Sequence, residues 1–464
     1  MTLRYISTRG QIDPCSFSQA VLMGLATDGG LLLPEAIPQV TARQLRHWAT
    51  LPFAELAAEV IRPFADETDL PNDDLRRLCQ RSFASFSHPA VTPVVRVGGR
   101  AILELFHGPT LAFKDVALQW LGNLFEYILT RDGGFLTILG ATSGDTGSAA
   151  IHGVRGRAGI QIFILHPHQR VSPIQERQMT TVLDSNVHNV AVRGSFDDGQ
   201  RIVKALFNDL PFRDQYRLGA INSINWARIL AQMVYYFSAW GQMTGGDPQR
   251  PLSFAVPTGN FGDIFAGYMA HRMGLPVERL ILATNRNDIL SRFFQTGRYG
   301  SDTAVATLSP SMDIQRASNF ERYLYYLLDQ DGAEVARHMA ELERSGEMRL
   351  PEAKRVEAAR LFTARAVSDA ETLEQIRRFH QETGYLLDPH TAVGMCAATE
   401  FPDALSLATA HPAKFGEAVR QAIGQEPELP ASLAGLLEKP SRCAVLEADP
   451  EVIKAHIITT LAAA

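Results

Sequence analysis

The sequence predicts an α/β protein with mainly parallel sheets. Three times along the chain, a short apolar run is followed by a turn rich in Gly or Pro and then by a helical pattern. Strands that alternate with helices are typical of βαβ units. The chain has 464 residues, 46% of them hydrophobic and 20% charged, which is enough for several cores at a prior of roughly 150 residues per domain. These values exclude a wholly disordered chain and a small disulfide-stapled scaffold.

The three copies of the pattern place most of the predicted elements. Their strands are residues 101–106, 135–139 and 252–256. Their turns span residues 107–110, 140–147 and 257–262. Their helices begin around Lys114, near Ser148 and at Asp263. Three more short apolar runs, 160–165, 187–192 and 280–284, are predicted as further strands.

Changes in composition along the chain predict three units. Residues 1–92 are predicted as an N-terminal domain. Its amphipathic stretch from Ala42 to about Phe64 and the prolines in its second half suggest helices joined by loops. A linker rich in Gly and Pro at 241–251 separates an α/β subdomain at 93–240 from a second one at 241–464. The second subdomain ends in helical patterns, one of which stops at Gly384 in the manner of a C-terminal glycine cap.

Charge and cysteine usage exclude several classes of partner. The net charge of −6 argues against binding to nucleic acid. The sequence contains neither an apolar run long enough to span a membrane nor a secretory signal. Four scattered cysteines and histidines without suitably spaced partners predict no disulfide framework and no metal site. We therefore expect a cytoplasmic protein that does not bind membranes.

Lys114 is the first candidate for chemistry. It lies where a turn passes into a helix, among the apolar residues Phe113, Val116 and Ala117. Burial and the positive end of the helix both disfavour the ammonium form, and a lysine with a depressed pKa can form a Schiff base with an aldehyde. The alternative is an ordinary lysine at a helix start, paired with Asp115.

Two turns between a strand and a helix are candidate anion sites. The loop at 141–147, Ala-Thr-Ser-Gly-Asp-Thr-Gly, has backbone N–H groups and hydroxyls that can converge on a carboxylate or a phosphate. The loop at 257–263, Pro-Thr-Gly-Asn-Phe-Gly-Asp, offers a similar cradle. Each is equally a plain turn in which Ser143, Asp145 or Asp263 stands at the start of the helix. Arg228, Arg316 or Arg322 could hold a phosphate, although such arginines are more often ion-paired. Together with Lys114, the two loops suggest a phosphorylated aldehyde cofactor and an acidic substrate.

The motifs around these residues resemble those of threonine synthase, in the longer form found in many bacteria and fungi. They are LELFHGPTLAFKD at 103–115, GATSGDTGSAA at 140–150, NSINWAR at 222–228, VPTGNFGD at 256–263 and TAHPAKF at 409–415, after DGGLLLPE at 28–35. The resemblance implies fold-type II, the tryptophan synthase β-like fold. In that fold pyridoxal 5'-phosphate lies between two α/β subdomains, here preceded by an extra N-terminal domain.

The resemblance also implies roles for individual residues. Lys114 would hold the cofactor as a Schiff base and act as the catalytic base. The cofactor phosphate would be surrounded by Gly259, Asn260, Phe261, Gly262 and Asp263. The cofactor ring would be contacted by Thr409 at its nitrogen and by Asp145 at its hydroxyl. The substrate would be bound by Thr142, Ser143, Thr146, Asn225 and Arg228.

The implied reaction converts O-phospho-L-homoserine and water into L-threonine and phosphate, in a monomer or a homodimer. A rival with the same fold is a serine or threonine dehydratase, or a threonine-synthase-like phospho-lyase that releases 2-oxobutyrate. A rival from another class is a silent phosphate- or nucleotide-sensing module that uses the two loops only for binding. The intact Lys114 favours an enzyme.

Overall fold

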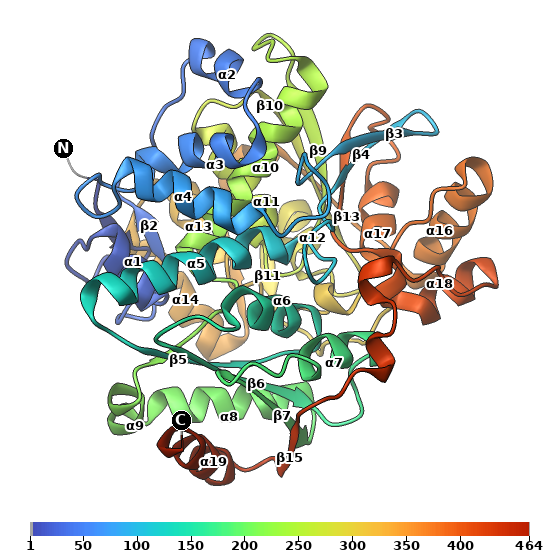
Figure 1. Cartoon of the computed structure of the whole chain (residues 1–464). Coiled ribbons are helices and arrows are strands. Elements are labelled where there is room, and N and C mark those ends of the chain that lie inside the picture. The colour runs from blue at the N-terminus through green and yellow to red at the C-terminus, as the bar shows by residue number, and fades with distance from the viewer. Residues whose placement is uncertain (1–2, 464) are drawn as a thin grey trace.

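Two sheets carry the glycine-rich turns in this computed structural model, which describes residues 3–463 (Figure 1). The five-stranded sheet has the order β15 (Ala444–Glu447), β7 (Val187–Arg193), β6 (Ile160–Pro167), β5 (Leu136–Ala141) and β8 (Leu218–Gly219). The six-stranded sheet has the order β13 (Phe362–Ala366), β10 (Val277–Thr284), β9 (Leu252–Pro257), β14 (Leu405–Ala408), β4 (Arg100–Glu104) and β3 (Val94–Val97). Neighbouring strands are parallel throughout both sheets, except in the antiparallel pair of β3 and β4. The predicted fold class is confirmed.

Helices lie on both sides of the five-stranded sheet. The helices around this sheet are α5 (Lys114–Asp132), α6 (Asp145–Val154), α7 (Pro173–Thr180), α8 (Phe196–Asn208), α9 (Leu210–Gln215) and α19 (Pro450–Ala462). In Figure 1, α5 and α6 lie above the sheet, and α8, α9 and α19 lie below it. The six strands predicted from the motif copies and the extra apolar runs are all confirmed, with ends that differ by at most three residues.

The six-stranded sheet has its own set of helices. They are α11 (Gly262–Arg272), α12 (Ile289–Thr296), α13 (Phe320–Leu327), α14 (Gly332–Ser345), α15 (Glu352–Ala358), α16 (Asp369–Thr383), α17 (Pro389–Ala397) and α18 (Gly416–Ile423). Strands β11 (Arg298–Gly300) and β12 (Glu347–Arg349) pair antiparallel and form a separate two-stranded sheet. Short 3₁₀ turns occur at 62–64, 310–312, 412–415, 431–433 and 436–438. The predicted stop of a helix at Gly384 is confirmed, because this glycine is left-handed with φ 73° and caps α16.

The first 90 residues form helices joined by loops, as predicted, together with one short pair of strands. They form β1 (Tyr5–Ser7), α1 (Phe17–Met23), β2 (Leu32–Pro34), α2 (Ala42–Trp48), α3 (Phe53–Ile61) and α4 (Asn72–Phe83). The amphipathic stretch from Ala42 to Phe64 contains the two helices α2 and α3, which are separated at Pro52, the N-cap residue of α3. Helices α3 and α4 pack against α10 (Trp226–Thr244) and α5.

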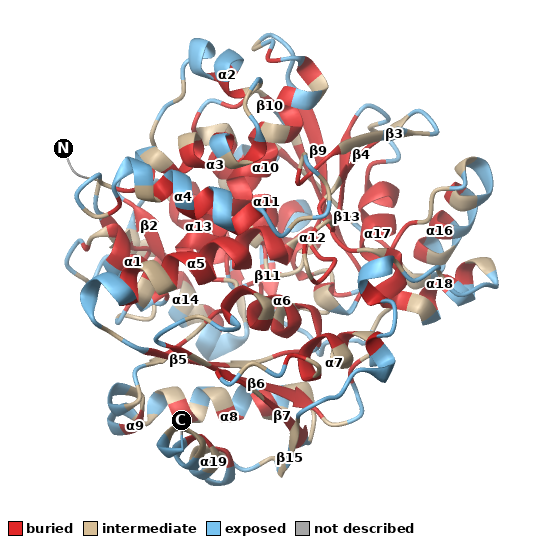
Figure 2. Cartoon of the chain, viewed as in Figure 1, coloured by how far each residue is buried: buried red, intermediate tan, exposed pale blue. Residues whose placement is uncertain are grey.

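Helix α10 is the central element of the core. It is buried over nearly its whole length, so it has no polar face turned to solvent (Figure 2). It also continues to Thr244, so the first four residues of the segment predicted as a linker are helical. Gly241 lets this last part of the helix pack closely against the N-terminal region, because a Cβ at this position would lie 3.0 Å from the Cα of Ala49.

Among residues 3–463, every helix is too short or too polar to cross a lipid bilayer.

The two sheets exchange segments across the predicted boundaries. Strands β3 and β4 lie within 93–240 yet pair into the six-stranded sheet, whereas β15 lies within 241–464 yet pairs with β7. The C-terminal segment crosses from α18 to β15 and α19 at the lower end of the molecule (Figure 1). The division into units remains a proposal, and we propose to move these two segments to the sheets that they join.

Candidate active site

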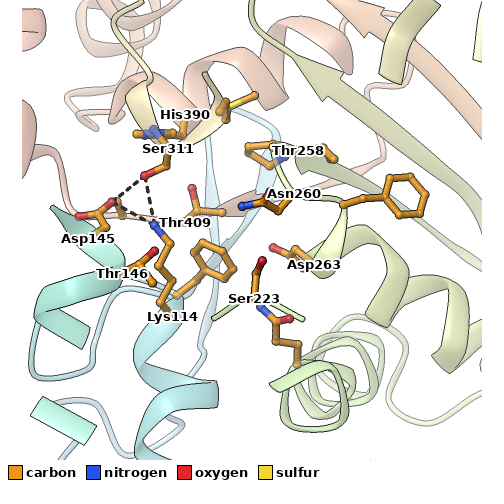
Figure 3. Close-up of a pocket in the computed structure, with 18 of the residues that line it drawn as sticks. Lys114, Asp145, Thr146, Ser223, Thr258, Asn260, Asp263, Ser311, His390 and Thr409 are labelled. Atoms are coloured by element: carbon orange, nitrogen blue, oxygen red, sulfur yellow. Dashed lines mark hydrogen bonds and ion pairs between the residues drawn. The ribbon is translucent and has the colours of Figure 1, made fainter. Parts of the chain in front are cut away.

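A pocket between the two sheets is lined by residues from all three motif copies (Figure 3). Lys114, the first residue of α5, is 8% exposed, and its amine points into this pocket. The turn before it is fixed at both ends, because Thr110 binds the Asp115 carboxylate through its backbone N–H and its hydroxyl. The N–H of Phe113 donates to the carbonyl of Thr409 at 2.8 Å, which ties the turn to the end of β14.

Asp145, the first residue of α6, lies beside the Lys114 amine. Its Oδ2 is 3.6 Å from Lys114 Nζ and accepts a hydrogen bond from the Ser311 hydroxyl at 3.1 Å. Lys114 Nζ in turn donates to Ser311 Oγ at 3.1 Å (Figure 3). On the other side, Asp145 Oδ1 accepts from Gln175 at 2.8 Å and lies 2.7 Å from Lys414 Nζ. The carboxylate is therefore held from both sides.

Burial and charge set the protonation of this pair. Burial lowers the pKa of Lys114 to about 8, with the nearby charges of Lys414 and Arg228 acting in the same direction and Asp145 acting against them. The pKa of Asp145 lies well below its usual range, because the attraction of Lys414 and Lys114 outweighs the effect of burial. At neutral pH this carboxylate is ionised, and a sizeable fraction of Lys114 is available as a neutral amine just above neutrality.

The third turn forms a cradle at the start of α11. Gly259 is required by close approach, since a Cβ there would lie 2.7 Å from the carbonyl oxygen of Ser311. Phe261 holds the loop in place, because it is left-handed with φ 64° and its ring is 1% exposed among the rings of Phe294, Phe320, Tyr323 and Phe362. Among residues 3–463, no side chain makes a capping hydrogen bond at the N-terminus of α11. Its first N–H groups are thus free to bind an anion.

Arg228 lines the pocket next to this cradle. It is 4% exposed, its Nη1 makes a long 3.4 Å contact with the carbonyl of Ile221, and its Nε lacks a partner among the described residues. Burial without a carboxylate partner lowers its pKa to about 10. A buried and unpaired guanidinium is costly, so this position is suited to a bound anion. Arg316, by contrast, pairs with Glu343 on the surface, and Arg322 binds backbone carbonyls in the core.

Asp263 contributes a second unpartnered group to the pocket wall. Its Oδ1 accepts from the hydroxyls of Tyr235 at 2.6 Å and Tyr236 at 2.9 Å, while its buried Oδ2 has no partner among the described residues. Burial raises the pKa of Asp263 to about 7, although the two tyrosines lower it. This carboxyl is therefore largely protonated in slightly acidic solution.

The raised pKa of Asp263 predicts a specific pH dependence of stability. Between the unfolded value near 3.8 and the folded value near 7, the folded state binds more protons than the unfolded state. The stabilising contribution is therefore fully present below the unfolded value and is lost as pH rises through about 7. Relative to Asp263→Asn, we expect the wild-type free energy of unfolding to fall by on the order of 3 kcal/mol from pH 5 to pH 8. Chemical denaturation of the cofactor-free protein measures this.

The control for this prediction is Asp197→Asn, which changes an exposed carboxylate on α8. It should leave the wild-type pH dependence in place. Parallel stability curves for wild type and Asp263→Asn over this pH range would contradict a protonated Asp263.

Most of the predicted site residues lie at this pocket. Its lining includes Lys114, Asp145, Thr146, Arg228, Gly259, Asn260, Phe261, Gly262, Asp263 and Thr409. Three others are absent from it. Thr142 closes its own loop by accepting from the N–H groups of Gly144 and Gly147, and Ser143 is exposed. Asn225 caps α10 and donates to the carbonyl of Val21.

Several residues of the pocket were not singled out from the sequence. Ser311 and His390 line it, and the N–H of Ser311 donates to His390 Nε2 at 3.3 Å. His390 is fixed in turn by Asp388, whose Oδ1 lies 2.9 Å from its Nδ1. Thr258, Ser223 and Gln232 add polar groups. A signal for His390 was present in the Asp-Pro-His order, in which Asp388 caps α17 and places the histidine in its first turn.

Family models and the sequences of known proteins match this chain over most of its length. The family model described as "Pyridoxal-phosphate dependent enzyme" matches residues 89–350. The models "Threonine synthase N terminus" and "Threonine synthase, C-terminal" match residues 4–83 and 391–457. The threonine synthase of Pseudomonas aeruginosa is 51% identical over 462 residues, which cover 98% of each chain. The chain belongs to the threonine synthase family.

Solved structures agree with this membership of the threonine synthase family. The structure of threonine synthase from Brucella melitensis with bound pyridoxal phosphate is 46% identical and superposes with a TM-score of 0.96 over 99% of each chain. Threonine synthase from yeast is 44% identical, with a TM-score of 0.94 over 99% of each chain. The fold-type II architecture with an added N-terminal region, inferred from the motifs, is confirmed.

The pocket fits pyridoxal phosphate, the cofactor of this family of enzymes. A lysine amine with a lowered pKa suits a reactive aldehyde. The uncapped start of α11 and the orphaned Nε of Arg228 suit phosphate groups. The pocket thus contains the donor groups that such a ligand needs on both sides.

Proposed function

We propose that the chain converts O-phospho-L-homoserine and water into L-threonine and phosphate. The observation that carries this proposal is the buried Lys114 amine, which faces an uncapped glycine cradle on one side and the unpaired Arg228 on another. A substrate with an amine, a carboxylate and a phosphate needs one reactive amine and several separate anion-binding groups. The family membership supports the same reaction.

We assign the cofactor to residues on three sides of the pocket. Lys114 would bind it covalently, and the backbone of Gly259 to Gly262, with Asp263 behind it, would hold its phosphate. Thr409, at the end of β14, would face the ring nitrogen, and Asp145 would face the ring hydroxyl. When bound, pyridoxal phosphate supplies an electron-withdrawing ring that makes the carbon-bound protons of an attached amino acid acidic.

The Lys114 amine would move the protons of the reaction. As a neutral base it can take the proton from the α-carbon of the substrate and then the proton from the β-carbon, after which phosphate leaves the γ-carbon. It can return protons to the γ-carbon and the α-carbon, while water adds to the β-carbon. Ser311 and Asp145 orient the amine through the contacts at 3.1 and 3.6 Å. The pocket walls keep these groups away from bulk water.

The substrate anions would bind at the remaining donors. We assign the substrate phosphate to Arg228, because its Nε lacks a partner among the described residues. Thr146 lines the pocket at the start of α6, where helix N–H groups favour a carboxylate. Thr142, Ser143 and Asn225 stay in the proposed substrate set only through the family motifs. In the structure, Thr142 stabilises the loop at 141–147 and Asn225 caps α10.

Removal of the Arg228 charge should have two opposite effects. In Arg228→Met, the affinity for phosphate-bearing ligands should fall by about tenfold to a hundredfold, because a charge-assisted contact is lost. The ligand-free protein should be as stable as wild type or more stable, because a buried unpaired guanidinium is removed. Titration calorimetry with inorganic phosphate and thermal unfolding without ligand measure the two effects.

Arg316→Met is the matched control, since Arg316 is exposed and pairs with Glu343 on the surface. It should change neither quantity. Loss of stability together with unchanged phosphate binding in Arg228→Met would assign Arg228 to the core instead of the site.

A product assay tests the proposed function directly. The purified holoenzyme is supplied with O-phospho-L-homoserine, and threonine, phosphate and 2-oxobutyrate are quantified together. Equal amounts of threonine and phosphate support the proposal. Release of 2-oxobutyrate would support the phospho-lyase or dehydratase alternative, and the absence of any turnover would support a binding module.

A further inference from the structure

Lys414 is a buried lysine that lies outside the pocket lining, and the proposed reaction gives it no role. Its side chain is fully buried (0% exposed), in the 3₁₀ turn at 412–415 that follows β14. Only six of the 44 basic residues of the chain are lysines, and two of them, Lys114 and Lys414, lie against the same carboxylate. A fully buried ammonium is costly and is retained where it is closely paired. Its partners therefore indicate what it does.

The contacts of Lys414 differ from those of Lys114. Lys414 Nζ lies 2.7 Å from Asp145 Oδ1 and donates to the carbonyl of Thr110 at 2.7 Å. Lys114 Nζ lies 3.6 Å from the other oxygen of the same carboxylate. Two ammonium groups thus share one carboxylate, and the shorter contact belongs to Lys414.

We propose that Lys414 is a positioning residue that holds the Asp145 carboxylate from outside the pocket. By sharing the charge of this carboxylate, Lys414 leaves the Lys114 amine without a counter-ion of its own. This inference deepens the proposed function, because it assumes that Lys114 is the reactive amine. It adds a residue that touches neither the pocket nor its ligands. Lys414 acts only through Asp145 and through its positive charge.

The charged and titratable groups around Lys114, Asp145 and Lys414 show why Lys414 is the residue assigned this role. Lys114 is faced by Asp145 and, at longer range, by Lys414 and Arg228. His390 faces Asp145, and Asp115, His152 and His411 lie within the field of Lys414. Of the cations, Lys414 both contacts the carboxylate and repels the Lys114 ammonium. Removal of its charge should therefore let Asp145 pair with Lys114 alone, which makes Lys114 harder to deprotonate.

The test measures the titration of Lys114 in the full-length protein freed of cofactor. A trace acylating reagent is applied across a pH series, and labelling of the Lys114 peptide is quantified by mass spectrometry. The exposed Lys204 and Lys439 serve as internal standards. In Lys414→Gln, which keeps a hydrogen-bond donor but not the charge, the midpoint of Lys114 labelling should rise by about one pH unit. In Lys414→Arg, which keeps the charge, it should stay near the wild-type midpoint.

An unchanged or lowered midpoint in Lys414→Gln would overturn the proposal. An equal rise in Lys414→Arg would overturn it as well, because shape rather than charge would then set the titration. If Lys414→Gln does not fold, the comparison is made between Asp145→Asn and Asp145→Asn/Lys414→Gln, in which the buried carboxylate is absent. The double variant should again have the higher midpoint, and equal midpoints would reject the role. The labelling needs no substrate, so its outcome is independent of the product assay.

Discussion

Lys114→Ala is expected to lower turnover by at least about a thousandfold, because the reaction would lose the proposed covalent anchor of its cofactor and the proposed proton carrier. The visible absorption of the lysine-bound cofactor should disappear, and borohydride should no longer attach cofactor to the chain. The free energy of unfolding should be unchanged or slightly higher, since burial disfavours the Lys114 ammonium and Asp145 keeps its contact with Lys414. Steady-state kinetics, absorption spectra and chemical denaturation measure the three effects.

Lys204→Ala, on the exposed face of α8, is the control and should match wild type in all three measurements. Added ethylamine should restore part of the turnover of Lys114→Ala, because a small amine can occupy the vacated space beside Ser311 and Asp145. Activity above about a tenth of wild type in Lys114→Ala, without added amine, would remove Lys114 from its proposed role.

Gly122→Ala is expected to destabilise the protein by about 3 kcal/mol or more, as overpacking against a backbone does. A Cβ at Gly122, on α5, would lie 1.9 Å from the carbonyl oxygen of Gly153 on α6. A Cβ at Gly153 would in turn lie 2.5 Å from the carbonyl oxygen of Leu118. The two helices therefore touch through their backbones, and neither backbone can yield as a flexible side chain would.

The same substitution should also disturb the site, because α5 begins with Lys114 and α6 begins with Asp145. Any separation of the two helices changes the 3.6 Å contact between these residues. Urea denaturation and the apparent affinity for pyridoxal phosphate measure the two consequences. Gly199→Ala in α8 is the control, since its Cβ would meet only the side chain of Ala141 at 3.3 Å. Equal stability of the two variants would contradict the close approach of the helices.

The strand, turn and helix copies could be predicted from sequence because the information in each copy is local. Apolar runs of five or six residues mark β4, β5 and β9, and the polar turns after them mark the starts of helices. Helix α6 begins three residues earlier than predicted, at Asp145 rather than near Ser148. The reason is that the Thr142 hydroxyl accepts from two N–H groups and closes the turn early.

The elements and residues that were missed depend on contacts between distant parts of the chain. Strand β14 is only four residues long and is defined by its position between β9 and β4. Ser311 reaches the pocket from a 3₁₀ turn nearly two hundred residues after Lys114, with no periodic pattern around it. Lys414 lies within a motif that was noted, but its partner Asp145 is supplied by another helix. Asn225, conversely, has the residue type of a ligand and serves as a helix cap.

The crossing of the C-terminal segment has a consequence for synthesis of the protein. Strand β15 covers the edge of β7, although residues 252–423 between them build the other sheet. While the nascent chain emerges from the ribosome, the outer hydrogen-bonding edge of β7 stays bare until residue 447 has been released. The unpaired N–H and C=O groups of such a strand edge can pair with strands of other chains. We therefore expect chains that stop short of β15 to aggregate or to require a chaperone, even though every residue that lines the candidate active-site pocket has already been made.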